Sequence, residues 1–88
     1  MYRLRVSPRC ERGLRAARLA DARTHRRLVD AIRRLADDPR PDLATKLTAF
    51  DPPAWRMRVG DHRVVYEVHD REVVVVGVNA APRSEVYR

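Results

Sequence analysis

The chain has 88 residues, with 19 lysine and arginine residues against 12 aspartate and glutamate residues, so its net charge at pH 7 is +7. This length suits a single domain with a small core, and the single cysteine excludes an internal disulfide and a cysteine-based metal site. A strongly basic small protein is expected to bind a polyanion: nucleic acid, an acidic protein partner or an anionic membrane surface.

Nothing in the sequence predicts a segment that spans a membrane, and we expect no membrane partner. The longest apolar run, Val73–Val78, is far shorter than the ~20 residues of a membrane-spanning helix. The first residues lack the apolar stretch of a secretory signal, and a lone cysteine fits a reducing compartment. We therefore expect a cytoplasmic protein.

The first predicted elements are a strand and a helix. Residues Tyr2–Val6 alternate between apolar and polar side chains, which is typical of a strand. Ser7 followed by Pro8 predicts a helix start, because serine caps the first amides and proline suits the first turn. The helix is expected to run from Pro8 to about Ala22. Its apolar side consists mostly of small residues: Cys10, Leu14 and Ala17. Leu19 and Ala20 are candidates to extend this side toward the end of the helix.

A second helix is expected from a cap at Thr24 through Ala36. Its apolar residues repeat at intervals of three and four and form a core stripe: Leu28, Ala31, Ile32, Leu35 and Ala36. The short break between the helices predicts an antiparallel helical hairpin, which ends before Pro39 because the residue before a proline avoids the helical region. The segment Leu43–Phe50 is open to two interpretations, a helical turn or an irregular segment at the edge of the core.

The segment Trp55–Val68 carries the strongest signal in the sequence. It alternates at period two on both sides of Gly60–Asp61, which predicts a β-hairpin with a type II′ turn. Counted outward from the turn, Arg58 faces Arg63 on one side of the sheet. The other predicted pairs are Val59 with His62, Met57 with Val64, Arg56 with Val65 and Trp55 with Tyr66. Met57, Val64, Trp55 and Tyr66 are expected on the core side, and Arg56, Arg58, Arg63, Val65 and Glu67 on the other.

The rest of the chain completes the predicted fold. After a turn at Asp70–Arg71, the β-branched run Glu72–Val78 predicts a strand buried on both faces and central in its sheet. Residues Pro82–Arg88 predict a short C-terminal helix. Residues 1–88 are therefore expected to form one α+β domain, in which an N-terminal strand and a helical hairpin pack on a mainly antiparallel four-stranded sheet.

Two groups of residues are candidates for function. Directly opposed like charges destabilise a sheet by roughly 0.2–1 kcal/mol, so selection for stability alone gives little reason for Arg58 to face Arg63. The two arginines are either an anion site that grips phosphate groups or part of a solvated basic face. Tyr87, between Arg83 and Arg88, either stacks on a base beside phosphate-binding arginines or anchors the last turn to the sheet.

No metal or cofactor is predicted. His25, His62 and His69 have no metal-ligand spacing, and the last two fall at turns, where we expect exposure to solvent. The glycines are isolated, which excludes a phosphate-binding glycine loop, and no Ser/His/Asp or Cys/His arrangement indicates a nucleophile. Cys10 is expected to be a small core residue.

Three motifs together resemble the RelE/ParE superfamily of type II toxin–antitoxin toxins, specifically its RelE branch. They are WRMRVGDHRVVYEV, VVVVGV and RSEVYR, in the family's order, and the likeness extends over the whole chain. The resemblance implies a RelE-like fold and an endoribonuclease that enters the ribosomal A site and cuts the mRNA there. No metal is needed in that reaction: the RNA 2′-hydroxyl attacks its own 3′ phosphate and leaves a 2′,3′-cyclic phosphate and a 5′-hydroxyl.

The resemblance also implies a set of site residues. Arg56 and Arg58 fall where the family places basic residues on the hairpin strand, and Arg63 falls on an arginine that grips the scissile phosphate. Tyr87 falls on a tyrosine that stacks on the substrate, and Arg83 matches a basic residue nearby.

Two departures from the family concern proton transfer. The family commonly carries a basic residue or histidine where this chain has Ala80 and Ala81. Arginine at positions 56 and 58 is also a poor general base, because its pKa exceeds ~12. Either Tyr87, a histidine or the ribosomal RNA supplies the proton chemistry, or the chain is a weakened nuclease.

The leading prediction is a ribosome-dependent mRNA endoribonuclease that inhibits translation and is neutralised by a cognate antitoxin. An acidic, partly disordered antitoxin segment is expected to wrap around the basic face. The chain is expected to bind operator DNA only indirectly, through the antitoxin. One alternative is a ParE-like inhibitor of DNA gyrase. The other is a catalytically weakened toxin that acts only as an antitoxin-binding, autoregulatory module.

Overall fold

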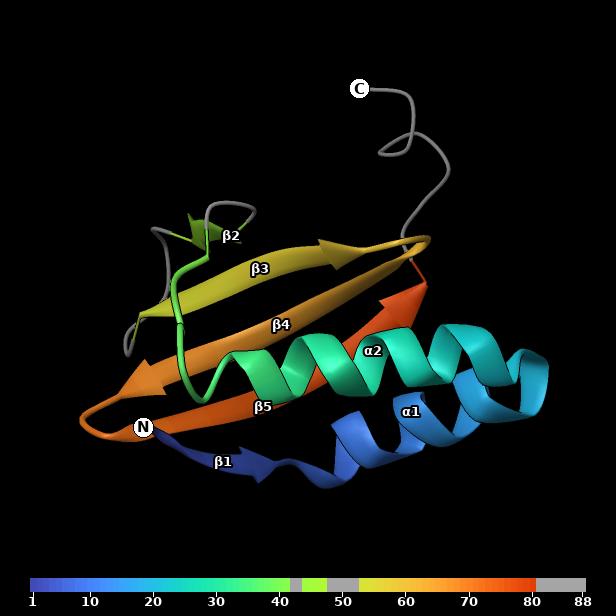
Figure 1. Cartoon of the computed structure of the whole chain (residues 1–88), viewed down its shortest axis with the longest axis horizontal. Coiled ribbons are helices and arrows are strands. Elements are labelled where there is room, and N and C mark those ends of the chain that lie inside the picture. The colour runs from blue at the N-terminus through green and yellow to red at the C-terminus, as the bar shows by residue number, and fades with distance from the viewer. Residues whose placement is uncertain (42–43, 48–52, 81–88) are drawn as a thin grey trace.

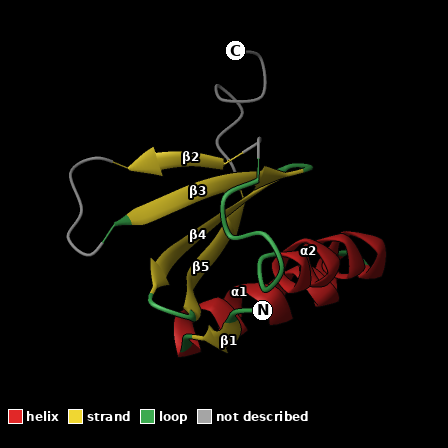
Figure 2. Cartoon of the chain, turned by 60° about the vertical axis from the view of Figure 1, so that its left-hand side comes forward, coloured by secondary structure: helices red, strands yellow, loops and turns green. Residues whose placement is uncertain are grey.

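The chain folds into two layers, a five-stranded sheet and a helical hairpin that packs on one of its faces (Figures 1 and 2). The computed structural model describes residues 1–41, 44–47 and 53–80. The elements are β1 (Arg3–Val6), α1 (Pro8–Ala20), α2 (Ala22–Arg34), β2 (Ala44–Leu47), β3 (Ala54–Val59), β4 (His62–His69) and β5 (Glu72–Ala80). The strand order is β1-β5-β4-β3-β2, with β1 parallel to β5 and every other pair antiparallel. The predicted α+β architecture is confirmed.

The prediction of four strands was one short, because Ala44–Leu47 forms the edge strand β2. This segment is neither a helical turn nor irregular, since its backbone pairs with β3 in the register Ala44 with Met57 through Leu47 with Ala54. Leu43, Phe50 and the predicted helix over residues 82–88 lie outside the described residues.

Ser7 joins the start of α1 to the sheet. Its hydroxyl oxygen accepts a hydrogen bond from the Cys10 amide (3.0 Å), as an N-cap should. The same hydroxyl donates to the Val76 carbonyl of β5 (2.6 Å). A few residues along, a β-carbon at Gly13 would overlap the carbonyl oxygen of Val78, so the backbones of α1 and β5 approach as closely as glycine allows.

Asp21, rather than Thr24, caps the second helix. The Asp21 carboxylate accepts hydrogen bonds from the Arg23 amide (3.1 Å) and the Thr24 hydroxyl (2.7 Å). These bonds, with the Thr24 contribution the largest, lower the pKa of Asp21. The Asp21 amide also donates to Ala17, so one residue ends α1 and begins α2. The first helix therefore ends two residues earlier than predicted, and the cap of the second lies three residues earlier, because a single aspartate serves both helices.

The core lies between the helices and the sheet. Its most buried side chains are Cys10, Leu28, Leu35, Val64, Tyr66, Val73 and Val75. The predicted α2 stripe is confirmed at Leu28, Ile32 and Leu35, whereas Leu19 is 83% exposed and takes no part in the core. Tyr66 is fully buried because its hydroxyl donates to the carbonyl of Pro39 (2.8 Å). Burial raises the pKa of Tyr66 to about 12.

The predicted hairpin register is confirmed pair by pair, from Val59 with His62 to Trp55 with Tyr66. Gly60 has a φ of +59°, and Asp61 is not among the residues with positive φ, which fits a type II′ turn. The run Glu72–Val78 lies within β5, between β1 and β4, as expected for an interior strand. No helix in the described part of the chain is long and apolar enough to cross a membrane.

Candidate functional site

The candidate site lies on the face of the sheet that α1 and α2 leave uncovered, which we call the outer face (Figure 2). Side chains alternate between the two faces along each strand. Met57, Val64 and Tyr66 belong to the core cluster on the helix side. Their neighbours along the strands therefore belong to the outer face: Arg56, Arg58, Arg63, Val65 and Glu67.

Three of the predicted site residues come together on this face. Arg58 pairs directly with Arg63 across β3 and β4, and Arg56 pairs with Val65 one step along the outer face. All three arginine side chains are half-buried. Two guanidinium groups in a directly opposed pair create a positive field that favours an anion between or above them.

Arg58 has one satisfied and one unsatisfied guanidinium donor among the described residues. Its Nε donates to the carbonyl of Gly60 (3.2 Å), which fixes the guanidinium beside the hairpin turn. Its Nη2 is buried and has no hydrogen-bond acceptor among the described residues. A buried donor without an acceptor is costly, and an incoming phosphate oxygen would satisfy it.

The other two predicted site residues, Arg83 and Tyr87, lie outside the described residues. The last described residue, Ala80, pairs with His62 next to the hairpin turn. The strand that leads to Arg83 and Tyr87 therefore ends at the same end of the sheet as Arg58 and Arg63.

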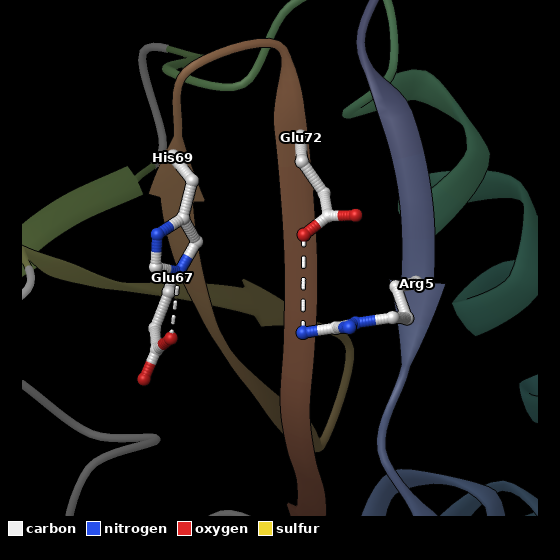
Figure 3. Close-up of polar contacts among 4 residues, drawn as sticks. All are labelled: Arg5, Glu67, His69 and Glu72. Atoms are coloured by element: carbon white, nitrogen blue, oxygen red, sulfur yellow. Dashed lines mark hydrogen bonds and ion pairs between the residues drawn. The ribbon is translucent and has the colours of Figure 1, made fainter.

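Sequence reasoning missed a polar pair on the outer face. His69 Nε2 lies 2.9 Å from Glu67 Oε1, two residues apart on β4 (Figure 3). The alternation of β4 placed Glu67 beside the arginines, but gave no sign that His69 would fold back onto it. His62 and His69 are intermediate in burial, so the expected exposure of these turn histidines holds only in part: the side chain of His69 is 38% exposed. Each lies at an end of β4 that is still paired with β5, His62 with Ala80 and His69 with Glu72, and the neighbouring strand covers part of its side chain.

A second charged feature lies on the helix side. A groove of about 740 Å³ runs between α2 and the turn end of β3 and has both charge signs in its lining, including Arg27, Arg34, Asp30 and Asp37. Cys10 lies elsewhere, fully buried in the core, and its burial raises the pKa of its thiol to about 11. Cys10 is therefore a packing residue and has no nucleophilic character near neutral pH.

Comparison with known proteins supports a shared family and fold. The model of the family described as "ParE toxin of type II toxin-antitoxin system, parDE" matches residues 4–85. No curated protein matches the chain.

Three solved structures are similar over nearly their whole length. A RelE–RelB complex from Pyrococcus horikoshii OT3 has a TM-score of 0.79 at 23% identity and covers 93% of this chain and 97% of that chain. A YoeB/ParE toxin from Agrobacterium tumefaciens has a TM-score of 0.75 at 22% identity, and the match covers 91% of this chain and 99% of that chain. A double mutant of Escherichia coli RelE in the free state has a TM-score of 0.68 at 27% identity, and the match covers 98% of this chain and 90% of that chain. The helical hairpin and the sheet with its outer face are thus arranged as in these proteins.

Proposed function

The chain belongs to the ParE toxin family of type II toxin–antitoxin systems, within the RelE/ParE superfamily, and from this premise we propose that it is a ribosome-dependent mRNA endoribonuclease. The observation that carries the proposal is the Arg58–Arg63 pair, two opposed cations on the outer face with Arg56 beside them. The two like charges destabilise the sheet when no ligand is bound, whereas the same two guanidinium groups can donate hydrogen bonds to a bound phosphate.

The proposed reaction needs no metal. The 2′-oxygen of the RNA forms a bond to the adjacent phosphorus, the bond from phosphorus to the 5′-oxygen breaks, and a 2′,3′-cyclic phosphate and a 5′-hydroxyl result. Negative charge builds up on the phosphate oxygens in the transition state. Fixed guanidinium groups stabilise that charge without reorganising, and this is the role we assign to Arg58 and Arg63 with Arg56 as support.

Arg83 and Tyr87 complete the proposed site from the C-terminal segment. Arg83 follows Ala80 by three residues, which span at most about 11 Å, so a contact with a phosphate near Arg63 is within reach. Tyr87 is proposed to stack on a substrate base, as aromatic side chains do in single-strand recognition. Ala80 and Ala81 contribute neither charge nor a proton donor.

The proposed partners are a cognate antitoxin, the ribosome and its mRNA. Similar structures include complexes of a toxin with RelB or YefM. A net charge of +7 suits an acidic antitoxin segment as well as ribosomal RNA. Such a protein acts in the cytoplasm and reaches operator DNA only through its antitoxin.

Induced expression in a bacterial host without the antitoxin tests the proposal. The wild-type chain is expected to stop growth and protein synthesis, and co-expression of the antitoxin is expected to restore both. Arg63→Ala should abolish the arrest. Arg15→Ala, which removes the same charge from an exposed position on α1, should leave the arrest intact. Full toxicity of both Arg58→Ala and Arg63→Ala would exclude the assigned phosphate site.

A second candidate function is inhibition of DNA gyrase. The family model that matches carries the ParE name, and the chain lacks a basic residue at Ala80 and Ala81. Gyrase-dependent DNA breaks that precede any fall in protein synthesis would favour this function. Normal growth together with tight antitoxin binding would instead indicate the weakened, autoregulatory module.

A further inference from the structure

The proposed reaction leaves one task unassigned, the removal of a proton from the 2′-hydroxyl. Arginine cannot perform it, because a guanidinium stays protonated at any pH near neutrality. Among the described residues, the outer face carries three side chains of the types that serve as general bases: Glu67 and His69 on β4, and Glu72 on β5.

Glu67 is the one of these three that lies beside the arginines. It pairs with Ala54, and Arg56, two residues along β3, pairs with Val65, so Glu67 and Arg56 are diagonal neighbours on the same face. Diagonal neighbours in an antiparallel pair have Cα atoms about 7–8 Å apart, within reach of long side chains. Glu72 lies two strands from Arg56 and faces Arg5 at the β1 edge, with 3.8 Å between Oε1 and Nη2 (Figure 3).

The Glu67 carboxylate is held in one orientation by His69. The ring nitrogen Nε2 lies 2.9 Å from Oε1, as a donor does when its hydrogen points at a carboxylate (Figure 3). Within the described residues, Oε2 has no hydrogen bond or ion pair and is open to a substrate hydroxyl. The side chains of His69 and Glu67 are 38% and 32% exposed, so a ligand on the outer face can reach them.

Charged groups reach Glu67 from both neighbouring strands. Ala54 and, diagonally, Arg56 face it from β3. Val74 and, diagonally, Glu72 face it from β5, where Glu72 is directly opposite His69 and pairs with Arg5. Arg56 is the site arginine nearest to Glu67 in the strand register, and His69 is the group in contact with it. A candidate base, a group that contacts it and a set of cations thus share one face of the sheet, and these are elements that general-base catalysis requires.

We infer that Glu67 is the general base of the proposed cleavage and that His69 is its positioning residue. The inference rests on the proposed endoribonuclease function. Glu67 accepts the 2′-hydroxyl proton as the 2′-oxygen bonds to phosphorus. The bond from phosphorus to the 5′-oxygen breaks, and the leaving oxygen takes a proton from water to give the 5′-hydroxyl. Glu67 then returns its proton to solvent, so the base is regenerated.

Single-turnover cleavage of mRNA on programmed ribosomes tests this assignment. Glu67→Gln should lower the cleavage rate at least about 100-fold, the range typical of a lost general base, with little change in the concentration for half-maximal rate. In the wild type the rate should rise with pH on the acid side, and this limb should be absent in Glu67→Gln. Glu67→Asp, which keeps a carboxylate, should retain the limb at a reduced rate.

Two further variants separate the roles. His69→Gln should lower the rate by less than Glu67→Gln while the acid limb persists, as expected of a positioning residue. Glu11→Gln, which removes the same charge from an exposed position on α1, should cleave as the wild type does. Unfolding temperatures of all variants are compared, so that a folding defect is recognised.

The possible results distinguish the inference from its premise. A wild-type chain that never cuts ribosome-bound mRNA would overturn the proposed function and the inference with it. A wild type that cuts, together with a folded Glu67→Gln variant that cuts within threefold of it, would overturn the inference alone. In that case Glu67 and His69 are a surface pair of the sheet.

Discussion

Replacing Arg58 by glutamine should stabilise the fold while it removes phosphate binding. Relief of the like-charge pair with Arg63 contributes roughly 0.2–1 kcal/mol. Removal of the buried Nη2 donor, which lacks an acceptor among the described residues, relieves a penalty of about 1–3 kcal/mol. Loss of the Nε bond to Gly60 costs about 0.5–1.5 kcal/mol in the other direction. The balance favours the variant by about 1 kcal/mol.

Thermal unfolding followed by circular dichroism measures this effect. In a domain of this size, ~1 kcal/mol corresponds to an increase in Tm of about 4–8 °C. The gain should shrink at high salt, because salt screens the repulsion between the guanidinium groups. Arg15→Gln removes the same charge from the exposed surface of α1 and should change the free energy of unfolding by less than ~0.5 kcal/mol.

Phosphate binding supplies the second half of the test. Inorganic phosphate or a short RNA should raise the Tm of the wild type, since a ligand that binds only the folded state stabilises it. The same ligands should have little effect on Arg58→Gln. A variant that is less stable than the wild type, or that responds equally to phosphate, would refute the argument that Arg58 is kept for an anion.

Three further predictions concern the scaffold. Gly13→Ala should destabilise the fold in urea titrations by about 1–3 kcal/mol although alanine favours helices, because its β-carbon meets the Val78 carbonyl and no rotamer relieves a backbone overlap. Tyr66→Phe should cost about 1–2 kcal/mol, since the buried Pro39 carbonyl loses its donor; an unchanged urea midpoint would contradict this. Arg71→Gly should raise stability by up to ~1 kcal/mol because Arg71 has a φ of +64°, a conformation that favours glycine, and a lower Tm would argue against strain there.

The arrangement of the central sheet could be predicted from the sequence, because the signals for its strands are local and periodic. Alternation in Trp55–Val68, together with Gly60 at the turn, determined the hairpin register, and therefore the opposition of Arg58 and Arg63. The three- and four-residue spacing of Leu28, Ile32 and Leu35 likewise determined which side of α2 is buried. In both cases burial of one face leaves a single register available.

The features that the sequence did not predict depend on tertiary contacts. Ala44–Leu47 is too short for a period and becomes a strand only because the edge of β3 offers it hydrogen bonds. Asp21 and Thr24 are both residue types that cap helices well. Asp21 is the cap because it is the single residue between the end of α1 and the start of α2. Leu19 is apolar but points away from the core.

The site was likewise predictable only in part. Parity along the strands placed Arg56, Arg58 and Arg63 on one face without any model of their surroundings. Parity cannot say that His69 contacts Glu67 or that Nη2 of Arg58 is buried, because both depend on rotamers and local packing. The proposed phosphate binding and the proposed general base rest on these two details.

Mapping of RNA 5′ ends after addition of the purified protein to ribosomes programmed with a defined mRNA tests the central claim most directly, with ribosome-free RNA alongside. If the chain is a ribosome-dependent endoribonuclease, new 5′-hydroxyl ends appear at A-site codons only in the presence of ribosomes, and none appear with Arg63→Ala. Intact mRNA in both reactions, from a folded protein that binds its antitoxin, would contradict the endoribonuclease function.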